Sequence, residues 1–130
     1  MKIAIPTQDY LTVSGHAGQA HHWLVYDLAG YAAGQVLPQP GRVELSKEQL
    51  PHYFKDDGPH PLDGVGLIVA GSAGDGFIRH MHKRGTDVLL TGETDPATAV
   101  TRVIAGEALP DKRFDITTVF CKLHDLFSRH

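Results

Sequence analysis

Cysteine is almost absent from this sequence, and long apolar runs are absent altogether. The single cysteine, Cys121, excludes a disulfide within the chain. No stretch of apolar residues is long enough to span a lipid bilayer. The chain runs from Lys2 directly into a short apolar segment, without the hydrophobic core of a signal peptide. We therefore expect a cytoplasmic protein that does not insert into a membrane.

An excess of positive charge is also missing. The formal net charge is -3, whereas nucleic-acid-binding proteins usually present a basic surface, so we expect no nucleic-acid partner. Hydrophobic residues make up 42% and charged residues 21% of the 130, which is ordinary for a globular domain with its own core. The unusual feature is nine histidines, which raise the question of metal binding.

Residues 65–96, VGLIVAGSAGDGFIRHMHKRGTDVLLTGETDP, form the clearest structural unit. Residues 65–69 make a nearly continuous apolar run, which predicts a strand buried on both faces. Gly71, Gly74 and Gly76 then mark a turn where the backbone needs unusual dihedral angles or a close approach.

The second half of this unit predicts a helix, a strand and the start of another helix. Apolar residues recur at helical spacing after the turn, and Gly85 ends that helix. Residues 88–90 form a second apolar strand, which should pair in parallel with the first through a right-handed crossover. Asp95 is placed to cap a helix that ends at Gly106.

The N-terminal part should supply three more strands, at residues 3–7, 21–28 and 33–37. The spacing of the last two favours antiparallel neighbours. The polar loop between the first two should turn Leu11 and Val13 inward.

Proline, charge and glycine dominate residues 38–61, which we predict to be mostly loop. Ser46 and Gln49 have the spacing of a capping box, so a short helix is expected near residues 47–54. The tail, residues 110–130, has apolar residues at helical spacing and should pack as an amphipathic helix.

His16 lies in the segment GHAGQAHH, in the loop that leaves the first predicted strand. If that strand runs parallel to the central pair, its exit loop meets the two later strand exits at the sheet edge where open α/β folds bind ligands. His16 would then face N–H groups at a helix N-terminus, which suits an anionic ligand. The alternative is a loop histidine that hydrogen-bonds to the backbone. His21 and His22 point to opposite faces of a strand, so at most one should join His16.

The segment Ser72-Ala73-Gly74-Asp75-Gly76 can hold an anion through its backbone N–H groups, although a tight turn that caps a helix is the commoner explanation. The segment is not a P-loop, because no Gly-Lys-Ser/Thr follows it.

Other histidines give weaker indications of a metal site. His80 and His82 would diverge by about 200° on a helix and cannot share one ion. Cys121 and His124 fall on one side of a helix, but zinc needs four ligands and only two are evident.

The motifs and their order resemble the dinitrogenase iron–molybdenum cofactor biosynthesis family of the NifX and NafY type, also fused at the C-terminus of NifB proteins. The similarity extends over residues 1–109. It depends on MKIAIPT, on GHAGQAHHWLVYDL, on the glycine turn after LIVAG, on RGTDVLLTGETDPATAV and on IAGEAL. One departure is Ala17, where the family usually has Phe.

The resemblance implies a ribonuclease-H-like three-layer α/β fold, with a mixed sheet of about five strands flanked by helices. Residues 1–109 would form this domain, and residues 110–130 a C-terminal extension packed on it. The protein is then expected to bind or carry an iron–sulfur or iron–molybdenum cluster or its precursor, without catalysis, and to meet cluster-assembly proteins. His16 matches the motif histidine and is the expected metal ligand. The expected cofactor-binding residues are His16, Gly71, Ser72, Gly74, Gly76 and Thr91.

Two other functions remain open at this point. Asp9, Asp27 and Asp63 would form the metal centre of a hydrolase if the fold brought their carboxylates together. Alternatively, residues 38–61 or the tail helix would serve a regulatory or interaction domain.

Overall fold

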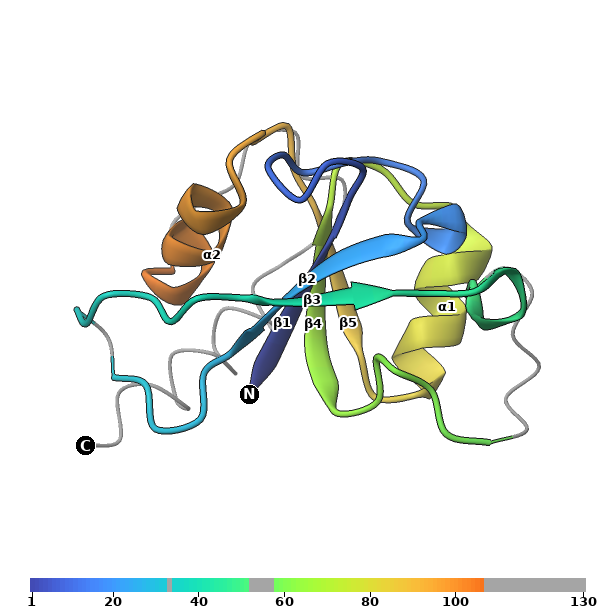
Figure 1. The fold of residues 1–130 in the computed structure, drawn as a ribbon, viewed down its shortest axis with the longest axis horizontal. Helices are drawn as coiled ribbons and strands as arrows, with labels where there is room; N and C mark the ends of the chain where they lie inside the picture. Colours follow the sequence, from blue (N-terminus) through green and yellow to red (C-terminus); the bar gives the residue numbers. More distant parts are fainter. Residues whose placement is uncertain (33, 52–57, 107–130) are drawn as a thin grey trace.

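The computed structural model describes residues 1–32, 34–51 and 58–106, which build one mixed sheet with a helix on each face (Figure 1). The elements in chain order are β1 (Lys2–Thr7), the 3-10 turn η1 (Ala17–Gln19), β2 (His22–Asp27), β3 (Gly41–Glu44), the 3-10 turn η2 (Lys47–Gln49), β4 (Val65–Ala70), α1 (Asp75–Lys83), β5 (Asp87–Leu90) and α2 (Pro96–Ile104).

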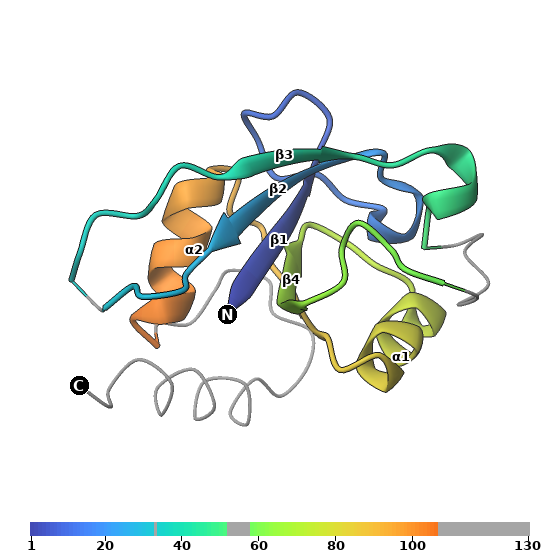
Figure 2. The same cartoon turned by 60° about the horizontal axis from the view of Figure 1, so that its bottom comes forward.

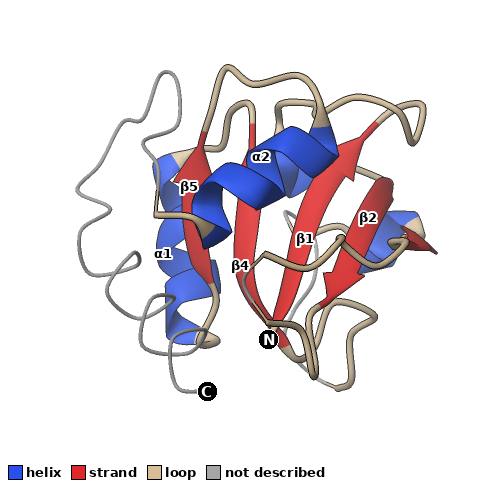
Figure 3. Ribbon diagram, turned by 90° about the vertical axis from the view of Figure 1, so that its left-hand side faces the viewer, coloured by secondary structure: helices blue, strands red, loops and turns tan. Residues whose placement is uncertain are grey.

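The five strands lie in the order β3-β2-β1-β4-β5. β1 and β5 each pair in parallel with β4, whereas β2 pairs antiparallel with both β1 and β3. Figure 3 shows α2 crossing in front of the sheet, with α1 behind it. The mixed five-stranded α/β architecture and the parallel central pair are therefore confirmed.

Two hydrophobic clusters, one on each face of the sheet, produce the three layers. In β4, Leu67 belongs to the cluster beneath α2, and its neighbour Ile68 belongs to the cluster beneath α1. Both side chains are fully buried, because each face of the central strands is covered by a helix. Figure 2 shows the helices on opposite sides of the sheet.

Local sequence signals account for the ends of both helices. The Asp95 carboxylate accepts a hydrogen bond from the Thr98 N–H (2.8 Å), as a residue that caps a helix should. Gly85 and Gly106 have φ angles of 85° and 76°, the left-handed region that glycine enters readily at the end of a helix. These predictions are confirmed.

The prediction of a strand at residues 33–37 is wrong for residues 34–37, the part of that range that the structure describes. Gly34 and Gln35 turn the chain there: the Gln35 N–H donates to the Ala32 carbonyl (3.1 Å), and Gly34 has φ of 93°. The third strand is instead β3, within the segment predicted as loop. β3 is four residues long and mostly exposed at the sheet edge, so its side chains carry almost no hydrophobic pattern.

Other expectations for the loops are met in part. The Gln49 side chain accepts from the Ser46 N–H (3.0 Å), as in a capping box, but the described helical turn is only η2. Val13 packs against the cluster beneath α2, whereas Leu11 is 70% exposed, so the prediction for Leu11 is wrong.

The predicted tail helix and Cys121 with His124 lie outside the described residues, as does the expected boundary after residue 109. Neither α1 nor α2, the α-helices of the described part, is long and apolar enough to cross a membrane.

Candidate functional site

Three loops meet at one edge of the sheet because β1, β4 and β5 run in the same direction. The loop after β1 is joined to the loop after β4 by a hydrogen bond from the Gly71 N–H to the Ser14 carbonyl (2.9 Å). It is joined to the loop after β5 by a bond from the Val13 N–H to the Thr94 carbonyl (2.8 Å). These loops lie together at the top of Figure 1. The predicted meeting of the three strand exits is confirmed.

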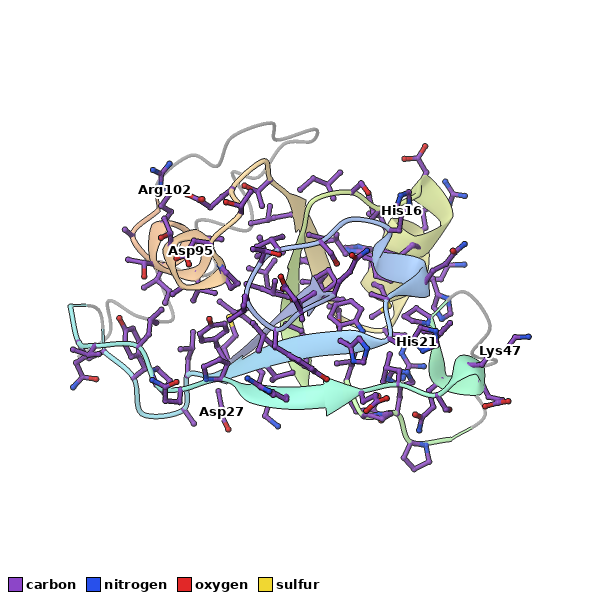
Figure 4. The ribbon with its side chains drawn as sticks, turned by 45° about the horizontal axis from the view of Figure 1, so that its top comes forward. His16, His21, Asp27, Lys47, Asp95 and Arg102 are labelled. Carbon is purple, nitrogen blue, oxygen red and sulfur yellow. The ribbon has the colours of Figure 1, made fainter. Side chains whose placement is uncertain are left out.

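His16 is held at this edge by its backbone. Its N–H donates to Ser72 Oγ (2.8 Å), and the Ala17 N–H donates to the Ser72 carbonyl (3.2 Å). The φ angle of His16 is 54°, a left-handed conformation that few non-glycine residues adopt. The side chain of His16 is exposed (Figure 4). The contacts with Ser72 therefore fix the backbone and leave the imidazole facing solvent.

Two glycines allow the loops after β1 and β4 to pack this closely. A Cβ on Gly15 would lie 2.4 Å from Ser72 Oγ, and a Cβ on Gly71 would lie 3.3 Å from the Ser14 carbonyl oxygen. Gly74 and Gly76 differ, because a Cβ on either would meet no atom closer than 3.9 Å and neither has positive φ. The predicted backbone constraint thus holds for Gly71 and is wrong for the other two.

An open cleft of about 460 Å³ adjoins His16 on the side of β1 and β2. This volume lies within the range of small-ligand sites. The lining residues are Thr7, Gln8, Ser14, Gly15, His16, Gln19, Ala20, His21 and His22. The cleft is therefore polar, and three of its lining residues are histidines.

His21 and His22 both line this cleft, so the prediction that only one of them could join His16 is wrong. β2 begins at His22, and strand alternation therefore does not extend back to His21. His21 Nδ1 lies 2.9 Å from the Leu45 carbonyl oxygen. His22 Nδ1 lies 3.0 Å from the Tyr10 hydroxyl, and the two rings pack edge to face. Each ring is thus anchored through one nitrogen.

Tyr10 is the second non-glycine residue with positive φ (61°) in the described part of the chain. Its conformation depends on Asp9, whose carboxylate accepts from the backbone N–H groups of Leu11 and Thr12 (2.8 and 2.9 Å). These bonds hold the pKa of Asp9 below its usual value. Both unusual backbone conformations therefore belong to the loop that carries His16, and Tyr10 anchors His22, which lines the cleft.

The remaining predicted binding residues lie around the cleft rather than in it. Thr91 is 2% exposed, and its hydroxyl accepts from the Glu93 N–H (2.9 Å), so it stabilises the loop after β5. Gly71 and Ser72 hold the loop of His16, as described above. Gly74 is the residue at the N-cap of α1, and Asp75 places a carboxylate in the first turn of that helix.

The structure does not bring Asp9, Asp27 and Asp63 together. Asp27 lies opposite Lys2, at the far end of β1 from the loop that holds Asp9. Asp63 pairs with Arg84 (2.7 Å) and accepts from the His60 N–H (2.8 Å); this N–H and Arg84 lower the Asp63 pKa. Among the described residues, no group of three or more His, Cys, Asp or Glu side chains is placed to hold a metal ion. The proposed carboxylate centre is therefore wrong.

Sequence reasoning missed that His21 and His22 both line the cleft and that Tyr10 supports His22. The signal in the sequence that could have indicated this was the pair of consecutive histidines, His21 and His22, at the start of β2. Only the folded loop shows that both residues line the cleft of His16.

A sequence comparison with protein families matches residues 1–106 to the family described as dinitrogenase iron-molybdenum cofactor. None of the curated proteins that were compared matches the chain.

Several solved structures share the fold. The crystal structure of PH0822 has a TM-score of 0.62 and 23% identity, and covers 85% of this chain and 96% of that one. An NMR structure from Thermotoga, provisionally assigned as a NifB protein, has a TM-score of 0.55 and 19% identity, and covers 88% and 96%. The apo form of the orange protein from Desulfovibrio gigas also has a TM-score of 0.55 and 19% identity, and covers 88% of this chain and 96% of that one.

Proposed function

The chain belongs to the dinitrogenase iron–molybdenum cofactor family, and from this membership we propose that it is a carrier for an iron–sulfur or iron–molybdenum cluster, or for a cluster precursor. The cargo would bind at the sheet edge described above, with His16 as a metal ligand. The protein would hold this cargo without transforming it and pass it to cluster-assembly proteins.

The observation that carries the proposal is the way His16 is presented. A left-handed backbone costs a non-glycine residue on the order of 1–2 kcal/mol. Here the contacts with Ser72 maintain that conformation, while the imidazole stays exposed beside a polar cleft. Backbone strain that surrounding contacts maintain is typical of ligand-binding positions.

The chemistry of the cleft suits such a cargo. Imidazole is a ligand for iron and for other transition metals, and sulfur-rich clusters carry negative charge that N–H donors can stabilise. Gly74 and Gly76 would contribute backbone N–H groups at the start of α1, where the helix dipole is positive. Gly71, Ser72 and Thr91 would act indirectly, by holding the loops. A single imidazole and a few N–H groups bind loosely, which allows release.

A test of the proposal supplies a synthetic, thiolate-ligated cubane iron–sulfur cluster to the full chain under anaerobic conditions. We expect the protein to retain visible absorption through gel filtration, and we expect His16→Asn to weaken binding at least about tenfold. Asparagine tolerates the left-handed conformation, so this variant should keep the loop while it removes the imidazole.

The matched control is His82→Asn on α1, an exposed histidine outside the cleft. It should bind the cluster as the wild-type chain does. A wild-type protein that elutes without the cluster would exclude the carrier function. Equal binding by His16→Asn would exclude His16 as the ligand.

A further inference from the structure

The ring of His21 is anchored in a way that leaves one nitrogen available as a metal ligand. Nδ1 lies 2.9 Å from the Leu45 carbonyl oxygen, which can only accept a hydrogen bond, so Nδ1 carries the proton. In the neutral imidazole, Nε2 then holds a free lone pair. Metal-ligating histidines usually show this arrangement, with the second nitrogen donating to a backbone carbonyl or a carboxylate.

The anchor of His21 is rigid. The Leu45 N–H donates to the His21 carbonyl (2.7 Å), so the two residues are joined through both backbone and ring. Leu45 itself is 1% exposed and belongs to the hydrophobic cluster beneath α1. The ring of His21 is therefore positioned by the core.

Two other histidines differ from His21 in this respect. In His60, Nδ1 accepts from the Leu62 N–H and Nε2 is bonded to the Gln49 carbonyl, so both nitrogens serve the structure. In His22, Nδ1 is bonded to the Tyr10 hydroxyl, which can donate or accept, so this bond does not determine the tautomer. Of these three histidines, His21 is the one whose anchor requires Nε2 to act as an acceptor.

His21 and His16 line the same cleft and come from the two ends of the segment that carries η1. Figure 4 shows both residues at the same end of the molecule. The backbone of His16 is held by Ser72, and the ring of His21 is held by Leu45. Two histidines thus line one cleft and are held by independent anchors.

We propose that His21 supplies a second metal ligand, through Nε2, so that metal in this cleft is bound by two imidazoles. This inference rests on the proposed function, because it names a further ligand for the same cargo. Two protein ligands leave the other coordination positions to sulfur atoms of the cargo or to water. Such a site exchanges its metal more readily than a closed four-ligand site.

The first test uses zinc alone and the full chain labelled with ¹⁵N. Long-range ¹H–¹⁵N spectra identify the histidine tautomers and the nitrogens that bind metal. We expect His21 to be protonated at Nδ1 before zinc is added. The Nε2 resonances of His16 and His21 should then shift together, with one apparent affinity.

The second test separates ligation from structural support. His21→Asn retains a side-chain N–H near the position of Nδ1, so it can still donate to the Leu45 carbonyl, but it removes Nε2. We expect the zinc affinity to fall at least about tenfold, since even the loss of groups that support a metal ligand has effects of this size. Thermal stability should be retained, and His82→Asn should bind zinc as the wild-type chain does.

Each outcome decides the inference. It is overturned if His21 Nε2 does not shift in the wild-type chain, if only other histidines respond to zinc, or if His21→Asn binds zinc with unchanged affinity. If His16 and His21 bind zinc together but the wild-type chain does not retain the iron–sulfur cluster, the carrier proposal fails while the two-histidine site stands. If the cluster is retained and His21 does not respond, only the second ligand is lost.

Discussion

At the scale of single residues, the candidate site depends on how closely two loops approach. The bond from the His16 N–H to Ser72 Oγ exists because Gly15 has no side chain to displace that hydroxyl. Small residues at a close approach thus shape the candidate site.

We predict that Gly15→Ala and Ser72→Ala each destabilise the protein by about 1 kcal/mol, because each removes the same hydrogen bond. The Cβ that Gly15→Ala introduces would lie 2.4 Å from Ser72 Oγ and force the hydroxyl to turn away. The double variant should therefore cost clearly less than the sum of the two single changes. Denaturant unfolding of the three variants measures this coupling.

Gly76→Ala provides the matched glycine control. It lies in α1, and its new Cβ would meet only the Arg79 guanidinium, at 3.9 Å. We expect it to stabilise the chain by about 0.4–1 kcal/mol. Fully additive effects of Gly15→Ala and Ser72→Ala would show that the two residues do not act through one bond.

At the scale of elements, the start of α2 shows how the hydrogen bonds of a helix cap change the pKa of the capping residue. Asp95 accepts from the N–H and the hydroxyl of Thr98 (2.8 and 2.6 Å), and Pro96 occupies the first helical position. The hydrogen bonds from Thr98 favour the ionised carboxylate and lower the pKa of Asp95 from its ordinary value of 3.8.

We predict that Asp95→Ala lowers the free energy of unfolding by about 1 kcal/mol at neutral pH. Because the pKa of Asp95 is lower in the folded chain, its stabilising contribution is fully present above pH 3.8 and is lost as the pH falls through the folded value. The difference between wild type and Asp95→Ala should therefore shrink in acid.

Asp95→Asn is the control for charge. Asparagine also caps helices but does not titrate, so its difference from Asp95→Ala should not change with pH. Denaturant unfolding of the three proteins across the acidic range measures both differences. A wild-type advantage that grows in acid would contradict the proposed sign.

At the scale of the whole molecule, one sheet joins two hydrophobic clusters. Leu67 and Ile68 are neighbours in β4, both fully buried, but they belong to different clusters. Trp23, the chain's one tryptophan, lies in the cluster beneath α1. Its fluorescence therefore reports on one face of the sheet, whereas circular dichroism reports on the backbone as a whole.

We predict that Leu67→Ala and Ile68→Ala each destabilise the protein by about 2–5 kcal/mol. Because both faces share the same strands, either change should shift the Trp23 fluorescence transition and the circular dichroism transition together. Leu67→Ala is the sharper test of this coupling, since the cavity that it creates lies on the face of the sheet away from Trp23. Separate transitions would show that the two clusters unfold independently.

The elements that could be predicted from the sequence are those with strong local signals. β4 and β5 are buried on both faces and therefore read as apolar runs, and Asp95 with Pro96 indicates the start of α2. β3 carries no such signal, because an exposed edge strand of four residues needs neither an apolar run nor a regular alternation. The position of His16 at the exit edge was predicted on the condition that β1 runs parallel to the central strands, and β1 does pair in parallel with β4.

The sequence alone determined the parallel unit of β4, α1 and β5 and the start of α2, because hydrophobic periodicity and helix caps act over a few residues; the three-layer arrangement was an expectation from the family resemblance. The tertiary structure alone decided which groups surround His16. Leu45 anchors His21, Tyr10 anchors His22, and Ser72 holds His16 through contacts across up to 56 positions of the chain. Such contacts depend on loop conformations, including left-handed angles at Tyr10 and His16, that no local pattern encodes.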